Sequence, residues 1–239
     1  MPEHSLLIIK NITHEGPGLL ESLLHEHGIA SHVEELSQGG TFPDPRNYRA
    51  VVVLGGPQSA NDKTPAMQLQ LRQIEVILED NIPFLGICLG MQAMVKAGGG
   101  NVIKSPVKET GFTDTENIPY RIDLTSAGKE APLFAGLESS IAVFQLHGET
   151  VELAPSGMEL LATSHHCKNQ VVKVGANAYG LQCHFEMTRP MFSDLISIDH
   201  DLRQMDSQSL LAQFDALYDE YTATGRMLMD NFLRIAGLV

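Results

Sequence analysis

The sequence predicts an α/β fold in which a doubly wound, mostly parallel β-sheet is flanked by helices, with a smaller mixed or antiparallel sheet and a helical C-terminal extension. The first half of the chain alternates short β-branched runs with helical patterns, which is the rhythm of βαβ units. The runs 6–9 and 51–54 are apolar without alternation, as in central parallel strands that helices cover on both faces. Beyond about residue 100 the chain changes to short strands separated by turn residues, and beyond residue 188 the pattern is helical.

In chain order, the first half contains strand-like runs and helical patterns in alternation. We expect strands at 5–10, 31–36, 50–54 and 83–87, and helices at 17–27, 65–79 and 88–97. This order is that of a flavodoxin-like, doubly wound sheet, in which helices connect parallel strands. The second half is predicted to form strands at 101–104, 108–112, 118–124, 141–145, 159–164, 171–174 and 179–183.

Apolar residues repeat at helical spacing near the C-terminus. One face runs from Leu210 to Tyr221 and another from Met227 to Ile235, so we expect helices divided near Gly225. The length of 239 residues is near the upper end of what one hydrophobic core serves, and no repeat or linker-like stretch is present. We therefore expect a single domain over 1–239, with a core at about 5–187 and a helical extension at about 188–239.

The charge balance excludes some classes of partner. Sixteen Lys and Arg residues against 29 Asp and Glu residues give a formal net charge of −13. Such a charge repels phosphate backbones and anionic membrane surfaces, so we expect no nucleic-acid partner and no membrane binding. No apolar stretch approaches the roughly 20 residues that cross a bilayer, and the start of the chain lacks the pattern of a signal peptide. The expected location is the cytoplasm.

The cysteines do not indicate a disulfide framework or a structural metal site. Cys88, Cys167 and Cys183 are odd in number and contain no CxxC pair. His165, His166 and Cys167 have soft ligand types, but adjacent residues of a strand point to opposite faces. We therefore expect no required metal and no cofactor, and each thiol must be assessed by its surroundings.

Cys88 lies in a pattern typical of a nucleophile elbow. The segment 83–92 runs from an apolar strand directly into a helical pattern, with Gly86 and Gly90 two positions on either side of Cys88. In such a turn the central residue is strained, and flanking glycines let the neighbouring backbone pass without a Cβ clash. At the first turn of a helix the thiol also feels the positive end of the helix dipole, which favours the thiolate. The alternative is a buried structural cysteine between two packing glycines.

A thiolate nucleophile needs a base, and the base needs an orienting group. If the run 180–186 is extended, His184 and Glu186 point to the same face, so that the carboxylate can fix the tautomer of the imidazole. Cys183 would then face away and act as a small buried hydrophobe. Taken alone, His184 could be a core histidine and Glu186 a surface charge, but their pairing with the elbow favours a catalytic role.

A third motif follows the strand at 50–54. Gly55 and Gly56 form a turn after that strand, and attack on an amide carbon requires backbone N–H donors for the oxyanion. One donor comes from the residue after the nucleophile, Leu89, and Gly56 is the natural second donor. A phosphate cradle is the competing interpretation, but no Lys-Ser/Thr pair follows as in a P-loop.

At these residues the sequence resembles the class I, Cys-His-Glu type, glutamine amidotransferases. The matching blocks are 55–57, 86–92, 143–149 and 182–186, and their order and spacing agree over residues 5 to about 187. The third block and the stretch through 153–155 most resemble the glutaminase part of GMP synthase and its stand-alone relatives. The resemblance implies Cys88 as nucleophile, His184 as general acid and base, Glu186 as its orienting group, and Gly56 and Leu89 as oxyanion donors.

The resemblance also implies a pocket for a glutamine-like substrate. It assigns the α-amino and α-carboxylate groups to Gln92 and to the backbone around Leu146, His147 and Gly148, with Gly55 among the substrate-binding residues. Met91 stands where many GMP-synthase-type glutaminases have His, and Leu146 where they commonly have Ser. Both departures are near the implied pocket. Within these 239 residues we expect no ATP-dependent synthetase domain like that of full GMP synthase.

Three functions are consistent with these residues. The first is a glutaminase that releases ammonia and glutamate through a cysteinyl thioester and delivers the ammonia to a separate synthase. The second is a hydrolase of γ-glutamyl amides or peptides that uses the same triad without a partner. The third is a catalytically silent binding protein on the same fold.

Overall fold

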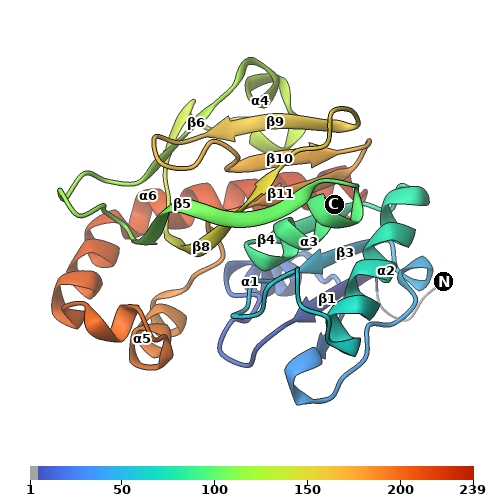
Figure 1. Ribbon diagram of the computed structural model, residues 1–239, viewed down its shortest axis with the longest axis horizontal. Helices are drawn as coiled ribbons and strands as arrows, with labels where there is room; N and C mark the ends of the chain where they lie inside the picture. Colours follow the sequence, from blue (N-terminus) through green and yellow to red (C-terminus); the bar gives the residue numbers. More distant parts are fainter. Residues whose placement is uncertain (1–4) are drawn as a thin grey trace.

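A computed structural model describes residues 5–239, which form one nine-stranded sheet, a separate two-stranded sheet and the helices around them (Figure 1). The strands are β1 (Leu6–Lys10), β2 (Ser31–Glu35), β3 (Ala50–Val53), β4 (Phe84–Ile87), β5 (Asn101–Gly111), β6 (Arg121–Leu124), β7 (Ser140–Ala142), β8 (Gln145–Glu152), β9 (Met158–Thr163), β10 (Val171–Val174) and β11 (Ala178–Leu181). The α-helices are α1 (Leu19–His27), α2 (Pro65–Glu79), α3 (Leu89–Ala97), α4 (Ser126–Glu130), α5 (Arg189–Ile198) and α6 (Ser207–Ile235), with short 3₁₀ turns at Leu36–Gln38, Pro45–Asn47, Pro132–Phe134 and Leu202–Gln204.

The predicted doubly wound sheet is confirmed. The large sheet has the order β2-β1-β3-β4-β11-β10-β9-β6-β7, and its first five strands are parallel. The remaining four strands pair antiparallel. The predicted smaller antiparallel sheet is the pair β5 and β8. Most short strands of the second half therefore extend the main sheet, because β10 pairs with β11 at the edge of the parallel part.

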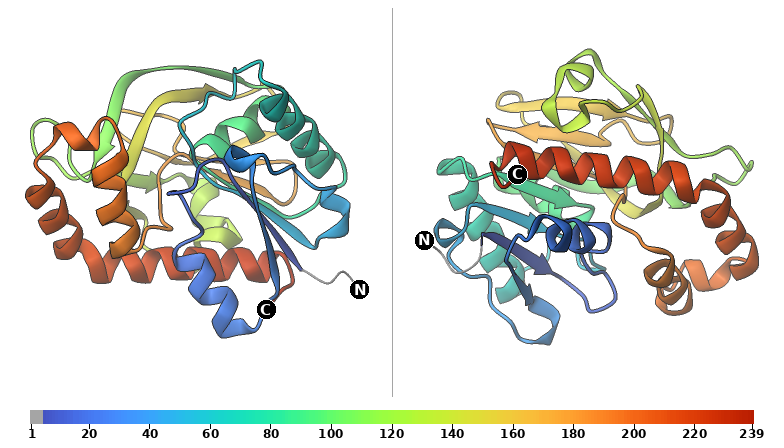
Figure 2. Two further views of the ribbon diagram at one scale, coloured as in Figure 1. Left: turned by 90° about the horizontal axis from the view of Figure 1, so that it is seen from below. Right: turned by 180° about the vertical axis from the view of Figure 1, so that it is seen from behind.

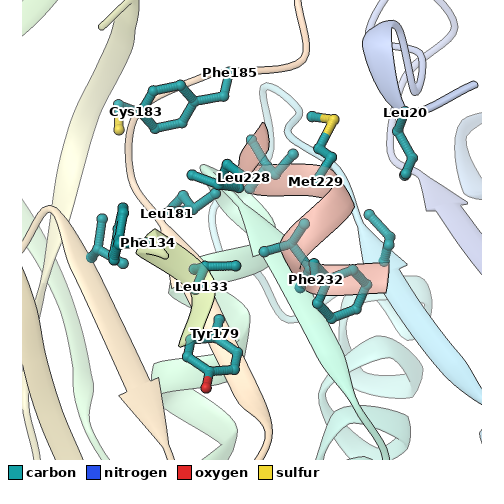
Figure 3. Close-up of a cluster of buried hydrophobic side chains, with 14 of the residues drawn as sticks. Leu20, Leu133, Phe134, Tyr179, Leu181, Cys183, Phe185, Leu228, Met229 and Phe232 are labelled. Atoms are coloured by element: carbon teal, nitrogen blue, oxygen red, sulfur yellow. The ribbon is translucent and has the colours of Figure 1, made fainter. Parts of the chain in front are cut away.

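Alternate residues of the central strands face two separate cores, as the unbroken apolar runs predicted. Leu6 and Ile8 pack in one cluster with α1 and the C-terminal half of α6, whereas Leu7 and Ile9 pack in another with α2 and α3. The rear view in Figure 2 shows α6 lying along the sheet on the face opposite α2 and α3. Figure 3 shows Leu228, Met229 and Phe232 of α6 within the first core.

The helical extension differs from the prediction in one respect. Instead of helices divided near Gly225, α6 runs unbroken from Ser207 to Ile235. A Cβ on Gly225 would lie 2.3 Å from the carbonyl oxygen of Phe185. Gly225 therefore marks a close approach between the helix and the segment after β11, and not a break. The N-terminal half of α6 and α5 enclose a third, largely aromatic core that contains Phe112, Phe144, Phe192, Phe214 and Tyr221.

Among residues 5–239, no helix combines the length and the apolar character needed to cross a membrane.

Candidate active site

Cys88 occupies a strained turn between β4 and α3. Its backbone has φ 50° and ψ −104°, a conformation that costs a non-glycine residue on the order of 1–3 kcal/mol. The backbone N–H of Cys88 donates to the carbonyl oxygen of Leu181 at 2.7 Å, which ties the turn to the end of β11. The predicted elbow geometry is confirmed. The side chain of Cys88 is largely buried, with 7% of its surface exposed.

The two flanking glycines make this turn possible. A Cβ on Gly86 would lie 2.5 Å from the carbonyl carbon of Gly90, and a Cβ on Gly90 would lie 2.1 Å from the carbonyl oxygen of Val53. Real Cβ atoms do not approach backbone so closely. The glycines therefore let α3 start directly against β3 and β4, with the cysteine at the carboxyl end of the sheet.

Sheet pairing brings the second motif to the same edge. Strands β4 and β11 are parallel neighbours, with Ile87 paired to Leu181, so the chain leaving β11 lies beside Cys88. The strand ends at Leu181, and His184 instead makes an isolated bridge in which its N–H donates to the carbonyl oxygen of Phe144 at 2.9 Å. The segment is less regular than the extended run that we expected, yet the predicted pairing forms.

His184 and Glu186 form a buried pair. The distance from Nδ1 of His184 to Oε1 of Glu186 is 2.6 Å, and the backbone N–H of Phe185 donates to the other carboxylate oxygen at 2.9 Å. Burial by itself would lower the pKa of His184, but the charge of Glu186 and the contact with Cys88 outweigh it and hold this pKa well above its ordinary value. The pair therefore favours an imidazolium whose Nδ1 donates to Glu186.

The opposite ring nitrogen has no protein partner within residues 5–239, and Cys88 lies near the same ring. Nε2 of His184 is buried and has no hydrogen-bond partner among the described residues, while the nearby Cys88 is one of the groups that raise the pKa of the ring. The sulfur has two further weak contacts: it can donate to the carbonyl oxygen of Leu146 at 3.8 Å, and the amide of Gln182 donates to it at 3.7 Å. The structure thus brings Cys88, His184 and Glu186 together in the order that thiol chemistry needs.

Two other elements hold the His184–Glu186 segment, and neither was foreseen from the sequence. The hydroxyl of Tyr221 on α6 donates to the carbonyl oxygen of His184 at 3.0 Å and accepts from the N–H of Met187 at 3.4 Å. The N–H of Leu19 at the start of α1 donates to the carbonyl oxygen of Glu186 at 2.9 Å. The helical extension therefore takes part in placing the imidazole.

The glycine turn after β3 faces the same sulfur. Gly56 lines the cavity that contains Cys88, and Gln58 holds the turn by donating to the carbonyl oxygen of Asn11 at 3.0 Å. Leu89 is the first residue of α3, where backbone N–H groups have no acceptor within the helix. Gly55 is buried, and a Cβ there would lie 2.2 Å from Oε2 of Glu15 and 3.2 Å from Cε1 of His184. Gly55 thus leaves room for these two side chains.

Helix α3 and strand β8 build another part of the cavity wall. Gln92 donates to the carbonyl oxygen of Glu149 at 3.1 Å and to Gln182 at 3.2 Å, and it lines the cavity with Leu146 and Gly148. Gln182, fully buried between Gln92 and Cys88, was not among the predicted site residues. In the sequence, only its position at the start of the 182–186 block indicated that Gln182 lies at the site.

His147 is held by protein groups on both ring nitrogens. Nε2 lies 2.9 Å from Oε2 of Glu109, and Nδ1 lies 3.0 Å from the carbonyl oxygen of Glu149. A contribution of this residue to substrate binding would therefore come from its backbone, as the resemblance implied.

Potential metal ligands gather at one place among the described residues. Glu109, His147 and Cys167 are buried, and their ligand-type atoms lie within 4.8 Å of one another. Hydrogen bonds inside the protein already join His147 to Glu109 and Cys167 to Thr150. His166 instead pairs with Asp114 at 3.3 Å, so the 165–167 run does not converge on one point. The third thiol, Cys183, packs in the first hydrophobic core, as predicted.

The cavity around Cys88 has a volume of about 900 Å³. Its wall comes from seven parts of the chain: the loop after β1, the glycine turn, the start of α3, strand β5, strand β8, the segment after β11 that carries His184, and the end of α5 with the residues after it. Glu15, on the first of these, is an acidic residue that the sequence reasoning missed. It is 7% exposed, and burial raises its pKa to about 7, an effect that nearby His184 reduces and the charges of Glu186 and Asp199 increase.

Comparisons with known proteins agree on one family. A model of the family described as glutamine amidotransferase class-I matches residues 20–195. The glutamine amidotransferase-like protein YfeJ of Salmonella typhimurium is 34% identical over 159 residues, which cover 64% of this chain and 63% of that protein. The GMP synthase of Bacillus subtilis is 33% identical over 234 residues, which cover 98% of this chain but 37% of the synthase.

Solved structures share the whole fold. A crystal structure of a glutamine amidotransferase from Thermotoga maritima has a TM-score of 0.84 and 28% identity, covering 98% of both chains. A glutamine amido transferase from Methylobacillus flagellatus has a TM-score of 0.85 at 24% identity, which supports the fold alone. Since the family model matches most of the chain and includes Cys88 and the 182–186 block, this protein belongs to the class I glutamine amidotransferase family.

Proposed function

We propose that Cys88, His184 and Glu186 are the catalytic triad of a glutamine-hydrolysing enzyme. The observation that carries the proposal is the strained Cys88 beside the ring of His184, whose Nδ1 is 2.6 Å from Glu186 and whose buried Nε2 has no partner among the described residues. Membership of the amidotransferase family implies glutamine as substrate. Gly56 and Leu89 are the proposed oxyanion donors, and one such donor is typically worth about 3 kcal/mol of transition-state stabilisation.

The proposed reaction proceeds in two halves. The Cys88 thiolate attacks the side-chain amide carbon, the imidazolium of His184 gives its proton to the amide nitrogen, and the C–N bond breaks to release ammonia. Water then attacks the γ-glutamyl thioester while His184 takes one of its protons. The C–S bond then breaks, which releases glutamate and restores the Cys88 thiolate. Gln92 and the backbone of residues 146–148 are proposed to bind the α-amino and α-carboxylate groups.

The fate of the ammonia gives two candidate functions. The chain matches only 37% of the length of the GMP synthase of Bacillus subtilis, so delivery to a separate synthase is one proposal. The cavity of about 900 Å³ favours a second one, since it is far larger than glutamine requires and could hold a γ-glutamyl amide with a bulky leaving amine. The cytoplasmic location remains a prediction.

Quantifying glutamate and ammonia from glutamine tests the proposal. We expect turnover by the wild-type protein and none by Cys88→Ala, whereas Cys167→Ala, which removes a thiol outside the cavity, should keep it. Activity that rises on adding a synthase would support the first candidate, and efficient unassisted cleavage of γ-glutamyl amides the second. If the wild-type protein turned over none of these amides, both candidate functions would be wrong, and the third function, a catalytically silent binding protein, would remain.

A further inference from the structure

We propose that Glu15 recognises a positively charged leaving amine, so that the preferred substrates are γ-glutamyl amides whose amine part carries a second, ammonium group. This inference rests on the proposed function and deepens it. It begins from a buried carboxyl that has no partner. Glu15 lines the cavity, and none of the hydrogen bonds or ion pairs of the described residues involves its carboxyl group.

The position of Glu15 assigns it to the leaving-group side. Oε2 of Glu15 and Cε1 of His184 both lie within 3.2 Å of the point that a Cβ on Gly55 would occupy. His184 is the proposed proton donor to the departing nitrogen, so that nitrogen must lie against its ring. A substituent on the nitrogen would therefore extend past Glu15.

The charges that line the cavity near Glu15 also favour a cationic leaving amine. Asp199, after α5, is close enough to Glu15 for its charge to raise the pKa of that carboxyl. Lys104 and Lys108 lie on β5, and Lys108 packs against Gly148 with its Cγ 3.8 Å from the point that a Cβ there would occupy. Lys108 also forms an ion pair with Asp201, so its charge is already balanced within the cavity wall. Among the described residues, the side near Glu15 and Asp199 is thus acidic without a lysine partner of its own, and it is the side that faces the leaving amine.

Energetics explain why a cation should occupy this place. A buried carboxylate without a hydrogen bond is unfavourable, and here burial raises the pKa of Glu15 to about 7 although the nearby charge of His184 acts to lower it. An ammonium group beside it would supply the missing partner and favour the carboxylate form. Gly55 is needed for this arrangement because any side chain there would displace the carboxyl group of Glu15.

The test compares amides of matched length on the wild-type protein. The probes are the γ-glutamyl amides of 1,4-diaminobutane, pentylamine and an ω-amino acid, whose tails are cationic, neutral and anionic. We expect kcat/KM for the cationic tail to exceed that for the neutral tail at least tenfold. The anionic tail should be the poorest substrate.

Variants then assign the preference to one carboxyl group. Glu15→Gln should reduce the ratio of cationic to neutral kcat/KM to below about threefold, and Glu15→Asp, which keeps the charge, should retain part of it. Glu149→Gln removes another acidic group of the same cavity and should leave the ratio unchanged.

The outcomes separate this inference from the proposed function. Turnover of glutamine or of the neutral amide without a cationic preference, or an unchanged ratio in a folded Glu15→Gln, would overturn the role of Glu15 alone. Turnover of glutamine with none of the substituted amides would do the same. Absence of any turnover, glutamine included, would overturn both.

Discussion

At the residue scale, the chemistry depends on the contact between His184 and Glu186. Glu186 fixes the imidazole through Nδ1, which leaves Nε2 without a hydrogen bond among the described residues, and its charge raises the pKa of the ring. No other charged partner of His184 lies within ion-pair distance among the described residues. The carboxylate therefore sets both the orientation and the charge of the base.

Replacing Glu186 by Gln should distinguish its effect on the orientation and charge of His184 from a general loss of folding. The variant keeps the shape of the side chain but loses its charge, so we expect kcat to fall on the order of 10²- to 10⁴-fold and the pKa of His184 to decrease. Steady-state kinetics and an NMR titration of the imidazole measure the two quantities. A folded variant with an unchanged His184 titration would contradict the role assigned to Glu186.

Glu15 should make stability depend on pH. Its pKa in the folded protein is about 7, above the ordinary value of 4.5. Between these two pH values the folded protein therefore holds a proton that the unfolded chain has released. The free energy of unfolding should therefore fall as pH rises from about 4.5 to 7, by up to about 3 kcal/mol from this group, and then level off.

Urea unfolding between pH 5 and 8 checks this contribution. Glu15→Gln cannot ionise, so it should lose less stability over this range and exceed the wild-type protein most at pH 8. Glu21→Gln, an exposed acid of α1, is the matched control and should follow the wild type. Identical pH dependence in Glu15→Gln and the wild type would show that Glu15 does not hold its proton in the folded state.

At the element scale, the site depends on how closely α3 approaches β3 and β4. Gly90→Ala would place a Cβ 2.1 Å from the carbonyl oxygen of Val53, and relief requires the helix to shift. We expect a loss of about 1–3 kcal/mol of stability, as in overpacked cores, together with reduced activity because the elbow moves. Gly16→Ala, where nothing lies within 4 Å of the added Cβ, should change stability far less. Equal melting temperatures of the two variants would refute the close-approach argument.

The elements also show what the sequence could and could not predict. The elbow, the apolar strands and the 182–186 block carry local patterns, and these were sufficient to predict the sheet and the residues that meet at its edge. Glu15 and Tyr221 have no such pattern, since their roles arise from contacts between distant segments. Gly225 was misinterpreted as a helix break because a glycine that permits close packing looks the same in a sequence as one that ends a helix.

At the scale of the whole molecule, the parallel and antiparallel halves share one sheet through the pairing of β11 with β4 and β10. The long helix α6 packs against the first core with its C-terminal half and against the aromatic core with its N-terminal half. The shared sheet joins the two halves of the predicted core at 5–187, and α6 joins the predicted extension at 188–239 to that core. Both features support the proposal of a single domain.

Unfolding should therefore occur in one cooperative transition. Far-UV circular dichroism and tyrosine fluorescence should give coincident urea curves, because no part of the sheet can separate without breaking a strand pair. Two resolved transitions, one for the antiparallel strands and one for the parallel part, would instead indicate two folding units.

The central claim is that Cys88 is the nucleophile of an amide-cleaving site shaped for a γ-glutamyl group. The most direct measurement is the intact mass and peptide map of the protein after reaction with a chloromethyl ketone analogue of glutamine under native conditions. We predict one adduct per chain, located on Cys88, absent from Cys167 and Cys183, and suppressed by glutamine. No adduct, or labelling that glutamine does not slow, would contradict the account.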